Sequence, residues 1–135
     1  MLGSADRGRA VTEGDTVSAE ATQTAVQGPV EICTLDDLER DWGEVALVGQ
    51  RQIAVFRMQD DTVYACDHAD PNSGALVMAR GIVGETVDGV PTLASPLYKE
   101  VYDLRDGSCR TGADFTLPVH KVSVEDGRVL VELGA

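Results

Sequence analysis

From residue 29 onward, apolar and polar side chains alternate, and turn-forming residues interrupt the alternation at short intervals. A period of two residues is typical of β-strands that are buried on one face. The clearest example is the last hairpin, in which residues 121–125 and 128–132 flank Asp126-Gly127. Asp-Gly in this setting favours a type I′ turn, because glycine adopts a positive φ without steric cost. The pattern therefore constrains the chain to antiparallel β structure.

The same pattern predicts further strands at 30–33, 43–48, 52–58, 63–66, 81–87, 90–94 and 101–104. Within 52–58, Ile53 and Val55 are expected on one face and Ala54 and Phe56 on the other. The segment 34–38 could form a single helical turn, with Thr34 as its N-cap. No segment shows a sustained helical period. The sequence therefore predicts an all-β domain, a small antiparallel sandwich or barrel.

The N-terminal segment differs from the rest of the chain. Residues 1–28 contain no aromatic residue and few large aliphatic ones, and Ala, Thr, Gly, Ser, Gln and charged residues supply most of the remainder. Such a composition cannot bury enough apolar surface to offset the entropy of ordering. We therefore expect a disordered tail at 1–28 and one folded domain at 29–135.

The formal net charge is −12. An acidic surface repels nucleic acid and anionic lipid, so neither is an expected partner, whereas a basic protein face would be attracted. Solubility is the simpler reading of this charge.

The three cysteines form no close-spaced cluster, and no apolar run is long enough for a signal sequence or a membrane span. A reducing, cytoplasmic location is expected.

One motif carries a resemblance to a known family. Ser95-Pro96-Leu97-Tyr98-Lys99, followed by Tyr102-Asp103 and Gly107, resembles the Cys-Pro-x-His-Gly and Phe-Asp-x-x-x-Gly pattern of Rieske iron–sulfur domains. The likeness extends over about residues 30–133. The closer likeness is to the small subunit of cytoplasmic NAD(P)H-dependent nitrite reductase. It is carried by the Asp-Pro loop and by the runs 80–84, 94–97 and 106–109.

The resemblance also implies where cluster ligands would stand. A Rieske cluster needs two thiolates on one iron and two imidazoles on the other, offered as Cys-x-His and Cys-x-x-His. The first pair falls on Asp70 and Asn72 and the second on Ser95 and Tyr98. Amide and phenol groups are poor iron ligands, and no thiolate remains. We therefore expect a Rieske-like fold without metal or cofactor on this chain.

Cys66-Asp67-His68 is a literal Cys-x-His, but it stands before the ligand position of the family and has no partner pair. A metal site needs convergent ligands, so we expect a strand-end cysteine and a surface histidine. A zinc site with Asp67 or Asp70 is the less favoured alternative. Cys109 is expected to be an ordinary apolar-side cysteine and His120 a structural or surface residue.

Trp42, the only tryptophan, is expected to pack in the core or at an edge. It is a less favoured candidate for a stacking platform.

By resemblance, the chain is an accessory subunit without catalytic residues. It would dock on the large subunit of a nitrite reductase that reduces nitrite to ammonium with NADH or NADPH. FAD, an iron–sulfur cluster and sirohaem would all lie on that large subunit. Pro71, Leu97 and Tyr98 are the candidate apolar contacts, although another face could bind instead. Two alternatives stay open: a [2Fe-2S] Rieske-type electron-transfer ferredoxin, and an interaction module unrelated to nitrogen metabolism.

Overall fold

The computed structural model describes residues 28–134 of the 135-residue chain. This part contains nine strands and two short 3₁₀ helices, η1 and η2. Their bounds are β1 Val30–Thr34, η1 Leu35–Asp37, β2 Gly43–Val48, β3 Arg51–Arg57, β4 Val63–Asp67, η2 Met78–Arg80, β5 Ile82–Glu85, β6 Pro91–Ala94, β7 Val101–Asp103, β8 Val119–Glu125 and β9 Arg128–Glu132. The prediction of an all-β domain is confirmed, and each predicted strand is present with small shifts at its ends.

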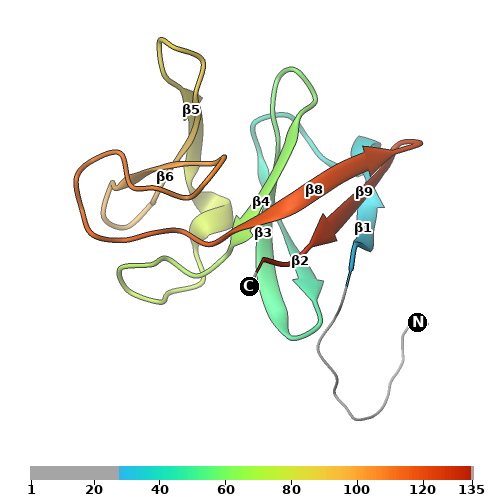
Figure 1. Ribbon diagram of the computed structural model, residues 1–135, viewed down its shortest axis with the longest axis horizontal. Helices are drawn as coiled ribbons and strands as arrows, with labels where there is room; N and C mark the ends of the chain where they lie inside the picture. The colour runs from blue at the N-terminus through green and yellow to red at the C-terminus, as the bar shows by residue number, and fades with distance from the viewer. Residues whose placement is uncertain (1–27, 135) are drawn as a thin grey trace.

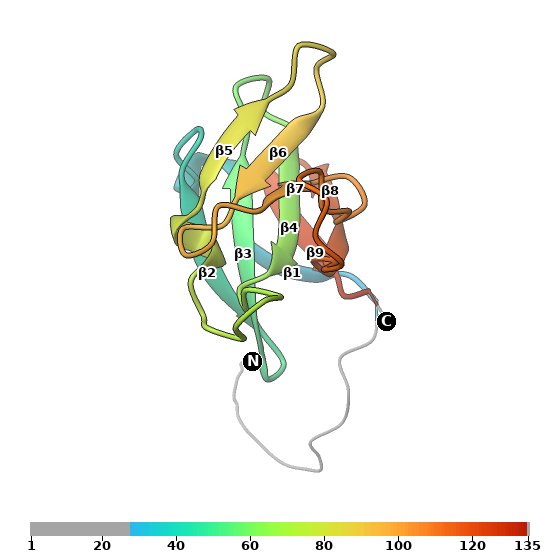
Figure 2. The same ribbon diagram turned by 90° about the vertical axis from the view of Figure 1, so that its left-hand side faces the viewer.

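The strands form two antiparallel sheets (Figures 1 and 2). The larger sheet has six strands in the order β1-β9-β8-β4-β3-β2, and its edge strands β1 and β2 approach each other, so that it is nearly closed. The smaller sheet has three strands in the order β5-β6-β7. The loop after β4 leads from the larger sheet towards the smaller one, and the loop after β6 joins two strands of the smaller sheet. The candidate site lies on these two loops.

The predicted turn of the last hairpin is confirmed. Asp126 and Gly127 have φ values of 53° and 76°, as a type I′ turn requires at both central positions. The turn sets the register in which Glu125 pairs with Arg128 and Val122 with Val131. The expected pairing of residues 81–87 with 90–94 is likewise found between β5 and β6, around Gly89.

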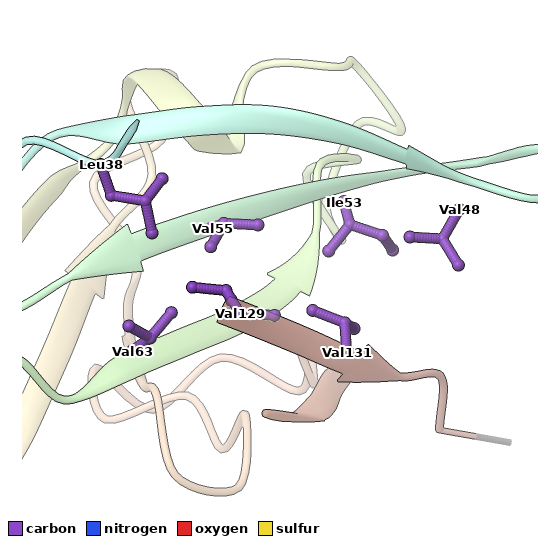
Figure 3. Close-up of a cluster of buried hydrophobic side chains, with 8 residues drawn as sticks. Leu38, Val48, Ile53, Val55, Val63, Val129 and Val131 are labelled. Atoms are coloured by element: carbon purple, nitrogen blue, oxygen red, sulfur yellow. The ribbon is translucent and has the colours of Figure 1, made fainter. Parts of the chain in front are cut away.

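Strand β3 is buried on both faces and separates two hydrophobic clusters. Ile53 and Val55 pack in one cluster with Val129 and Val131 of β9 (Figure 3). Their neighbours Ala54 and Phe56 pack in the other cluster, which reaches the smaller sheet. The predicted division of these four β3 residues between two faces is confirmed, and it explains how one strand holds both sheets together.

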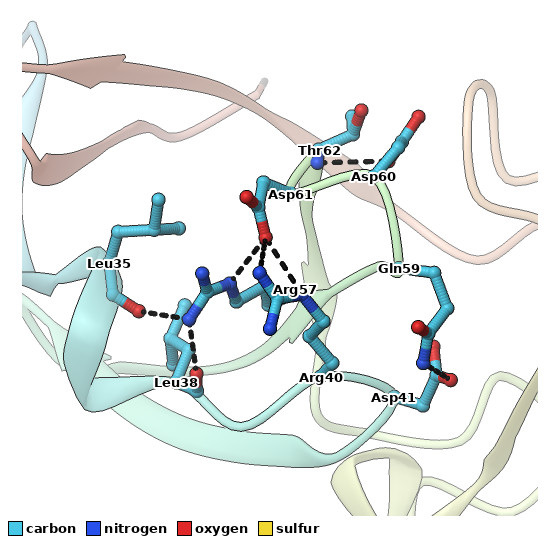
Figure 4. A network of polar contacts seen from close by, with 9 residues as sticks. All are labelled: Leu35, Leu38, Arg40, Asp41, Arg57, Gln59, Asp60, Asp61 and Thr62. Atoms are coloured by element: carbon cyan, nitrogen blue, oxygen red, sulfur yellow. Dashed lines mark hydrogen bonds and ion pairs between the residues drawn. The ribbon is translucent and has the colours of Figure 1, made fainter.

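A polar network fixes the segment between β1 and β2 (Figure 4). The Arg57 guanidinium donates to the backbone oxygens of Leu35 and Leu38, at 3.2 and 3.0 Å, and to Asp61 Oδ1 at 2.9 Å. The predicted cap is also present, because Thr34 N donates to Asp37 Oδ2 at 2.9 Å. The Leu35 oxygen also accepts the backbone N–H of Leu38 at 3.1 Å. The arginine therefore adds acceptor contacts at the end of η1, where a helix leaves carbonyl groups without helical partners.

No helix within residues 28–134 is long and apolar enough to cross a membrane. The expectation of a disordered tail at 1–28 concerns residues that, apart from Gly28, lie outside the described part of the chain.

Candidate functional site

The loops after β4 and β6 meet through one buried hydrogen bond. The Ser95 hydroxyl donates to Asp70 Oδ1 at 2.8 Å, and the two residues are only 3% and 1% exposed. In Figure 2 both loops lie below the β5–β6 hairpin. By the resemblance described above, Ser95 and Asp70 fall at the positions at which the Rieske pattern has its two thiolates. A direct hydrogen bond therefore joins the loops where iron would join them in that pattern.

The Asp70 carboxylate also shapes its own loop. Its Oδ2 accepts hydrogen bonds from the backbone N–H of Asn72 at 3.1 Å and from that of Ser73 at 2.8 Å. The Ser73 hydroxyl adds a third at 3.1 Å. The backbone of Asp70 pairs with Gly74 and Ala75 across the turn. An aspartate that accepts backbone N–H groups a few residues ahead stabilises a tight turn, so Asp70 acts as the structural centre of this loop.

The second loop keeps a defined backbone shape as well. Leu97 N donates to Ser95 Oγ at 3.3 Å, and Ser95 N donates to Glu100 O at 2.8 Å. Lys99 has a φ of 65°, in the left-handed region that favours glycine. Lys99 stands where the Rieske pattern has its glycine, so the loop geometry is retained although the residue has changed.

The two outer positions differ from the inner ones, because Asn72 and Tyr98 are exposed. Leu97 and Tyr98 are 48% and 49% exposed, and Pro71 is partly buried. We call Pro71, Leu97 and Tyr98 the tip. The structure therefore places the three predicted partner contacts on two joined loops, with apolar surface accessible on each.

The site is supported by three buried residues that follow the second loop in the chain, Tyr102, Asp103 and Gly107. Tyr102 is fully buried, and burial with the nearby Asp70 charge raises the pKa of its phenol to about 12. The Arg105 guanidinium binds the buried Asp103 carboxylate at 2.9 Å, and this hydrogen bonding lowers the pKa of Asp103. Gly107 has a φ of 82°, and a Cβ there would lie 1.8 Å from Leu117 O. The residues kept from the Rieske pattern are therefore those that hold the backbone.

These side chains do not fit a [2Fe-2S] cluster. The inner positions hold a hydroxyl and a carboxylate, and both Asp70 oxygens already accept hydrogen bonds from the protein. The outer positions hold an amide and a phenol, which are not imidazole-like ligands. The described residues also contain no group of three or more His, Cys, Asp or Glu that could hold a metal ion.

Cys66 and His68, the two residues of the literal Cys-x-His motif, both have structural roles. Cys66 is fully buried, and burial strongly raises the pKa of its thiol, so that the thiolate needed for metal binding is disfavoured. The expectation that His68 is a surface residue is wrong, because it is 7% exposed. Its Nδ1 accepts the backbone N–H of Ala79 at 3.1 Å, and its backbone oxygen accepts from Val77 and Met78. His68 therefore fixes η2 to the end of β4.

His120 is structural, as expected: it is 7% exposed, and its Nε2 lies 2.8 Å from Asp67 Oδ1. Cys109 packs at the margin of the second hydrophobic cluster, and its Sγ lies 3.2 Å from Thr111 Oγ1. Burial raises the pKa of the Cys109 thiol, but hydrogen bonds with Thr111 and the Ala113 backbone outweigh that effect and lower it. Among the described residues, neither His120 nor Cys109 belongs to a group of three or more His, Cys, Asp or Glu side chains that could hold a metal ion.

Trp42 was expected in the core or at an edge. The core position is wrong, because this side chain is 61% exposed, and the residue directly precedes the edge strand β2. It lines a groove of about 640 Å³ between β2 and η2, together with His68 and Leu76. This groove could not be predicted from the sequence, because η2 and β2 are distant along the chain and come together only on folding. The available signal was local: a lone tryptophan within the acidic run Asp41-Trp42-Gly43-Glu44.

Comparison with known proteins agrees with this architecture. A model of the Rieske-like [2Fe-2S] domain family matches residues 29–132. The nitrite reductase (NADH) small subunit of Escherichia coli (strain K12) is 36% identical over 100 residues, which cover 73% of this chain and 92% of that protein. The nitrite reductase [NAD(P)H] large subunit of Klebsiella oxytoca is 43% identical over 100 residues, or 74% of this chain, but the match spans only 10% of that larger protein.

A solved structure agrees as well. The crystal structure of a Mycobacterium tuberculosis protein, described as an NADH-dependent nitrite reductase small subunit, superposes with a TM-score of 0.75 at 37% identity. The superposition covers 82% of this chain and 98% of that one. The chain therefore belongs to the Rieske-like [2Fe-2S] domain family and, within it, to the family of nitrite reductase small subunits.

Proposed function

We propose that this chain is the accessory small subunit of an assimilatory-type NAD(P)H-dependent nitrite reductase, which reduces nitrite to ammonium. It acts by docking on the catalytic large subunit and carries no cluster itself. The observation that supports this most directly is the buried hydrogen bond from Ser95 to Asp70. It joins the two loops without iron and leaves them rigid enough to present a binding surface.

The electron path then lies entirely on the partner. Without thiolate or imidazole ligands at the loop positions, the domain has no means of holding a one-electron centre between the donor and nitrite. FAD, an iron–sulfur cluster and sirohaem are accordingly placed on the large subunit. The three cysteines are free thiols, which supports a reducing, cytoplasmic setting.

The Klebsiella relative supports a direct association with the catalytic chain. In that protein, the matching segment is a tenth of a longer polypeptide named as the large subunit, so the domain and the rest of that subunit are covalently joined. In the Escherichia coli relative, the match spans most of a separate small subunit. A domain that occurs both fused and separate is expected to keep the same neighbour, here through non-covalent contacts.

The tip is the proposed point of contact. Leu97 and Tyr98 are about half exposed, and aromatic side chains with accessible apolar surface often dominate the binding energy of an interface. The net charge of −12 favours a partner with a basic face. Pro71 stiffens the adjoining loop, so that little conformational entropy is lost when it binds.

The test is co-purification of the full chain with a large subunit from extract of the native organism, followed by iron and sulfide determination on the separated small subunit. The proposal requires a sirohaem-containing partner and iron-free small subunit. A stoichiometric [2Fe-2S] signal in anaerobically prepared small subunit would establish the ferredoxin alternative instead. Purification with no nitrite reductase would favour an unrelated interaction module.

A pair of substitutions tests the tip itself. The double variant Leu97→Ala/Tyr98→Ala is expected to weaken the complex at least tenfold, about 1.4 kcal/mol or more. The matched control is Ile82→Ala/Val87→Ala, which removes exposed apolar side chains from the β5–β6 hairpin. If the two double variants bind the large subunit with equal affinity, the interface does not include the tip.

A further inference from the structure

The larger sheet is open between its two edge strands, β1 and β2. The strand order ends at these strands, and no backbone hydrogen bond within residues 28–134 joins one to the other. A groove of about 500 Å³ lies there, and both strands contribute to its lining. Unpaired strand edges readily bind a further extended segment through main-chain hydrogen bonds. The groove therefore suits a short piece of extended chain.

The base of this groove is apolar. Leu38 and Val55 line it, and both belong to the hydrophobic cluster shown in Figure 3. Val30 and Ile32 of β1 also line it, and they are only partly buried. An apolar side chain placed between the strands would therefore extend an existing core and remove these residues from water.

The groove is also negatively charged. Glu31, Asp37 and Glu44 line it, and no described Lys, Arg or His does. Glu44 pairs with Val55 across β2 and β3, so both side chains lie on the face of the sheet that contains the core. Burial and the three negative charges raise the pKa of the Cys33 thiol, which lines the same groove. The three carboxylates therefore lie close to one point between the strands.

Two of these carboxylates have no cationic partner in the described part of the chain. Arg128 pairs with Glu31 at 3.3 Å, whereas no ion pair within residues 28–134 includes Asp37 or Glu44. The Arg57 guanidinium is held by its contacts with Asp61 and the backbone after β1. A positively charged segment would therefore gain attractions that the described domain does not supply.

The chain itself contains a segment that matches this groove. Arg7 and Arg9 are the only Lys or Arg residues before residue 40, and they belong to the run Arg7-Gly8-Arg9-Ala10-Val11. Alternate side chains of an extended segment share a face, so Arg7, Arg9 and Val11 would lie together. That face offers two cations to the carboxylates and one apolar side chain to the base. The residues between them are small, which leaves room for the neighbouring strands.

The connection to the groove is long enough. The segment is joined to β1 by residues 12–29, and Val30, the first residue of β1, itself lines the groove. A flexible coil of this length spans about 20–25 Å on average, compared with a radius of gyration of about 13 Å for a domain of this size. Binding within one chain also benefits from a high effective concentration, so weak contacts suffice.

We propose that residues 7–11 of this chain bind in the groove between β1 and β2 as an added extended segment. Arg7 and Arg9 face Asp37 and Glu44, and Val11 packs on the apolar base. The chain's own N-terminal segment then closes the larger sheet, and the tip stays accessible because no tip residue lines the groove. The inference does not rest on the proposed function, since the segment and the groove belong to the same chain.

The first experiment locates the segment in the isolated full chain. A nitroxide spin label is attached to Ala10→Cys, in a chain in which Cys33→Ser and Cys109→Ser remove the two partly exposed thiols. Cys66 is fully buried and stays unlabelled. Paramagnetic broadening of the amide resonances of β2 reports the approach of the label. The matched control carries the label at Ala21→Cys instead.

The two label positions distinguish binding from tethering alone. Residue 21 is nearer to the domain along the chain, so an unbound segment broadens β2 more strongly from residue 21 than from residue 10. The proposal requires the reverse order, with broadening from residue 10 about threefold stronger or more. A label at residue 10 that broadens β2 no more than the label at residue 21 overturns the proposal.

The second experiment tests the charges in the chain labelled at residue 10. Glu44→Lys is expected to reduce the broadening of β2 about threefold, and Arg7→Glu/Arg9→Glu by at least as much. Combining these substitutions places opposite charges across the groove again and should recover part of the broadening. Glu125→Lys makes the same charge change at an exposed position of β8 and is expected to have little effect. Circular dichroism and thermal unfolding establish that each variant is folded.

The remaining outcomes identify what occupies the groove. Equal reductions by Glu44→Lys and Glu125→Lys would show that overall charge acts, and they would overturn the pairing with Glu44. A mixture of isotope-labelled chain without the nitroxide and nitroxide-labelled chain without the isotope tests for a second copy. Equal broadening of β2 in this mixture would place the segment of another molecule in the groove and overturn binding within one chain. Both experiments omit the large subunit, so their failure leaves the proposed function unchanged.

Discussion

The imidazole of His120 lies between Asp67 and the end of the described chain. Its Nε2 is 2.8 Å from Asp67 Oδ1, and its Nδ1 accepts the backbone N–H of Gly134 at 2.9 Å. Because Nδ1 accepts, Nε2 carries the ring proton and donates to Asp67. The same carboxylate oxygen binds the Arg51 guanidinium at 2.8 Å. One buried ring thus joins β4 to β8 and to the residues that follow β9.

This relationship predicts that His120→Ala will destabilise the domain by about 2–4 kcal/mol, because it leaves a cavity and two polar groups without their partner. Urea unfolding followed by circular dichroism would measure the loss. His120→Gln is the control, since its amide can donate to Asp67 and accept from Gly134, and it should recover part of the stability. Equal losses in both variants would show that packing matters more than the two hydrogen bonds.

A second prediction concerns Gly107. Its φ of 82° and the 1.8 Å distance from a built Cβ to Leu117 O mean that Gly107→Ala must displace the backbone, at a cost of about 3 kcal/mol or more. Gly112 is a matched control with a φ of 93° but no atom within 4 Å of a built Cβ. Gly112→Ala should cost only the conformational strain, about 1 kcal/mol. Similar unfolding midpoints for the two variants would contradict this account.

The elements that were predictable from the sequence are those that local interactions fix. Asp126-Gly127 specifies its hairpin through backbone conformation alone, and the alternation within residues 52–58 specifies which β3 side chains share a face. The positions of Asp70 and Ser95 in the Rieske pattern also follow from the sequence. In each case, neighbours along the chain or a known pattern supply the information.

The rest depends on contacts between distant segments. The hydrogen bond of Ser95 to Asp70 connects residues 25 positions apart, and no local pattern predicts it. His68 is buried where η2 folds back over it. Trp42 is exposed next to Gly43, on which η2 packs. Tryptophan is highly buried on average and histidine is intermediate, so residue type alone predicts neither an exposed Trp42 nor a buried His68. Tertiary packing decides both positions.

A third prediction follows from the burial of His68. Burial and Arg80 lower the pKa of its imidazole in the folded state, whereas the unfolded value is about 6.5. The unfolded chain therefore binds more protons once the pH falls below about 6.5, and the free energy of unfolding decreases there. This loss continues until the pH reaches the lower, folded-state pKa.

The measurement is the urea midpoint as a function of pH. Wild type should lose stability from about pH 6.5 downward, and His68→Gln should lose less over the same range, because glutamine does not titrate. His120→Gln serves as the comparison at the second buried histidine. If the wild type and His68→Gln show the same pH dependence, His68 is not the group responsible.

The last prediction concerns the bond that joins the two loops. Ser95→Ala removes the hydroxyl that donates to Asp70 Oδ1 and leaves a buried carboxylate oxygen without that partner, at a cost of about 1–3 kcal/mol. Asp70→Ala should cost more, because Oδ2 also accepts from Asn72 and Ser73. In a double-mutant cycle, the two substitutions should therefore couple by about 0.5–3 kcal/mol, since both remove the same interaction.

The same cycle measured on binding relates the bond to function. If joined loops are needed to present the tip, Ser95→Ala and Asp70→Ala should each weaken affinity for the large subunit, although neither side chain is accessible to a partner. The two losses should again be less than additive. Ser95→Cys provides a conservative comparison, because a thiol is a weaker donor of similar shape. Loss of stability with unchanged affinity would show that the tip keeps its shape without this bond and that docking depends on another surface.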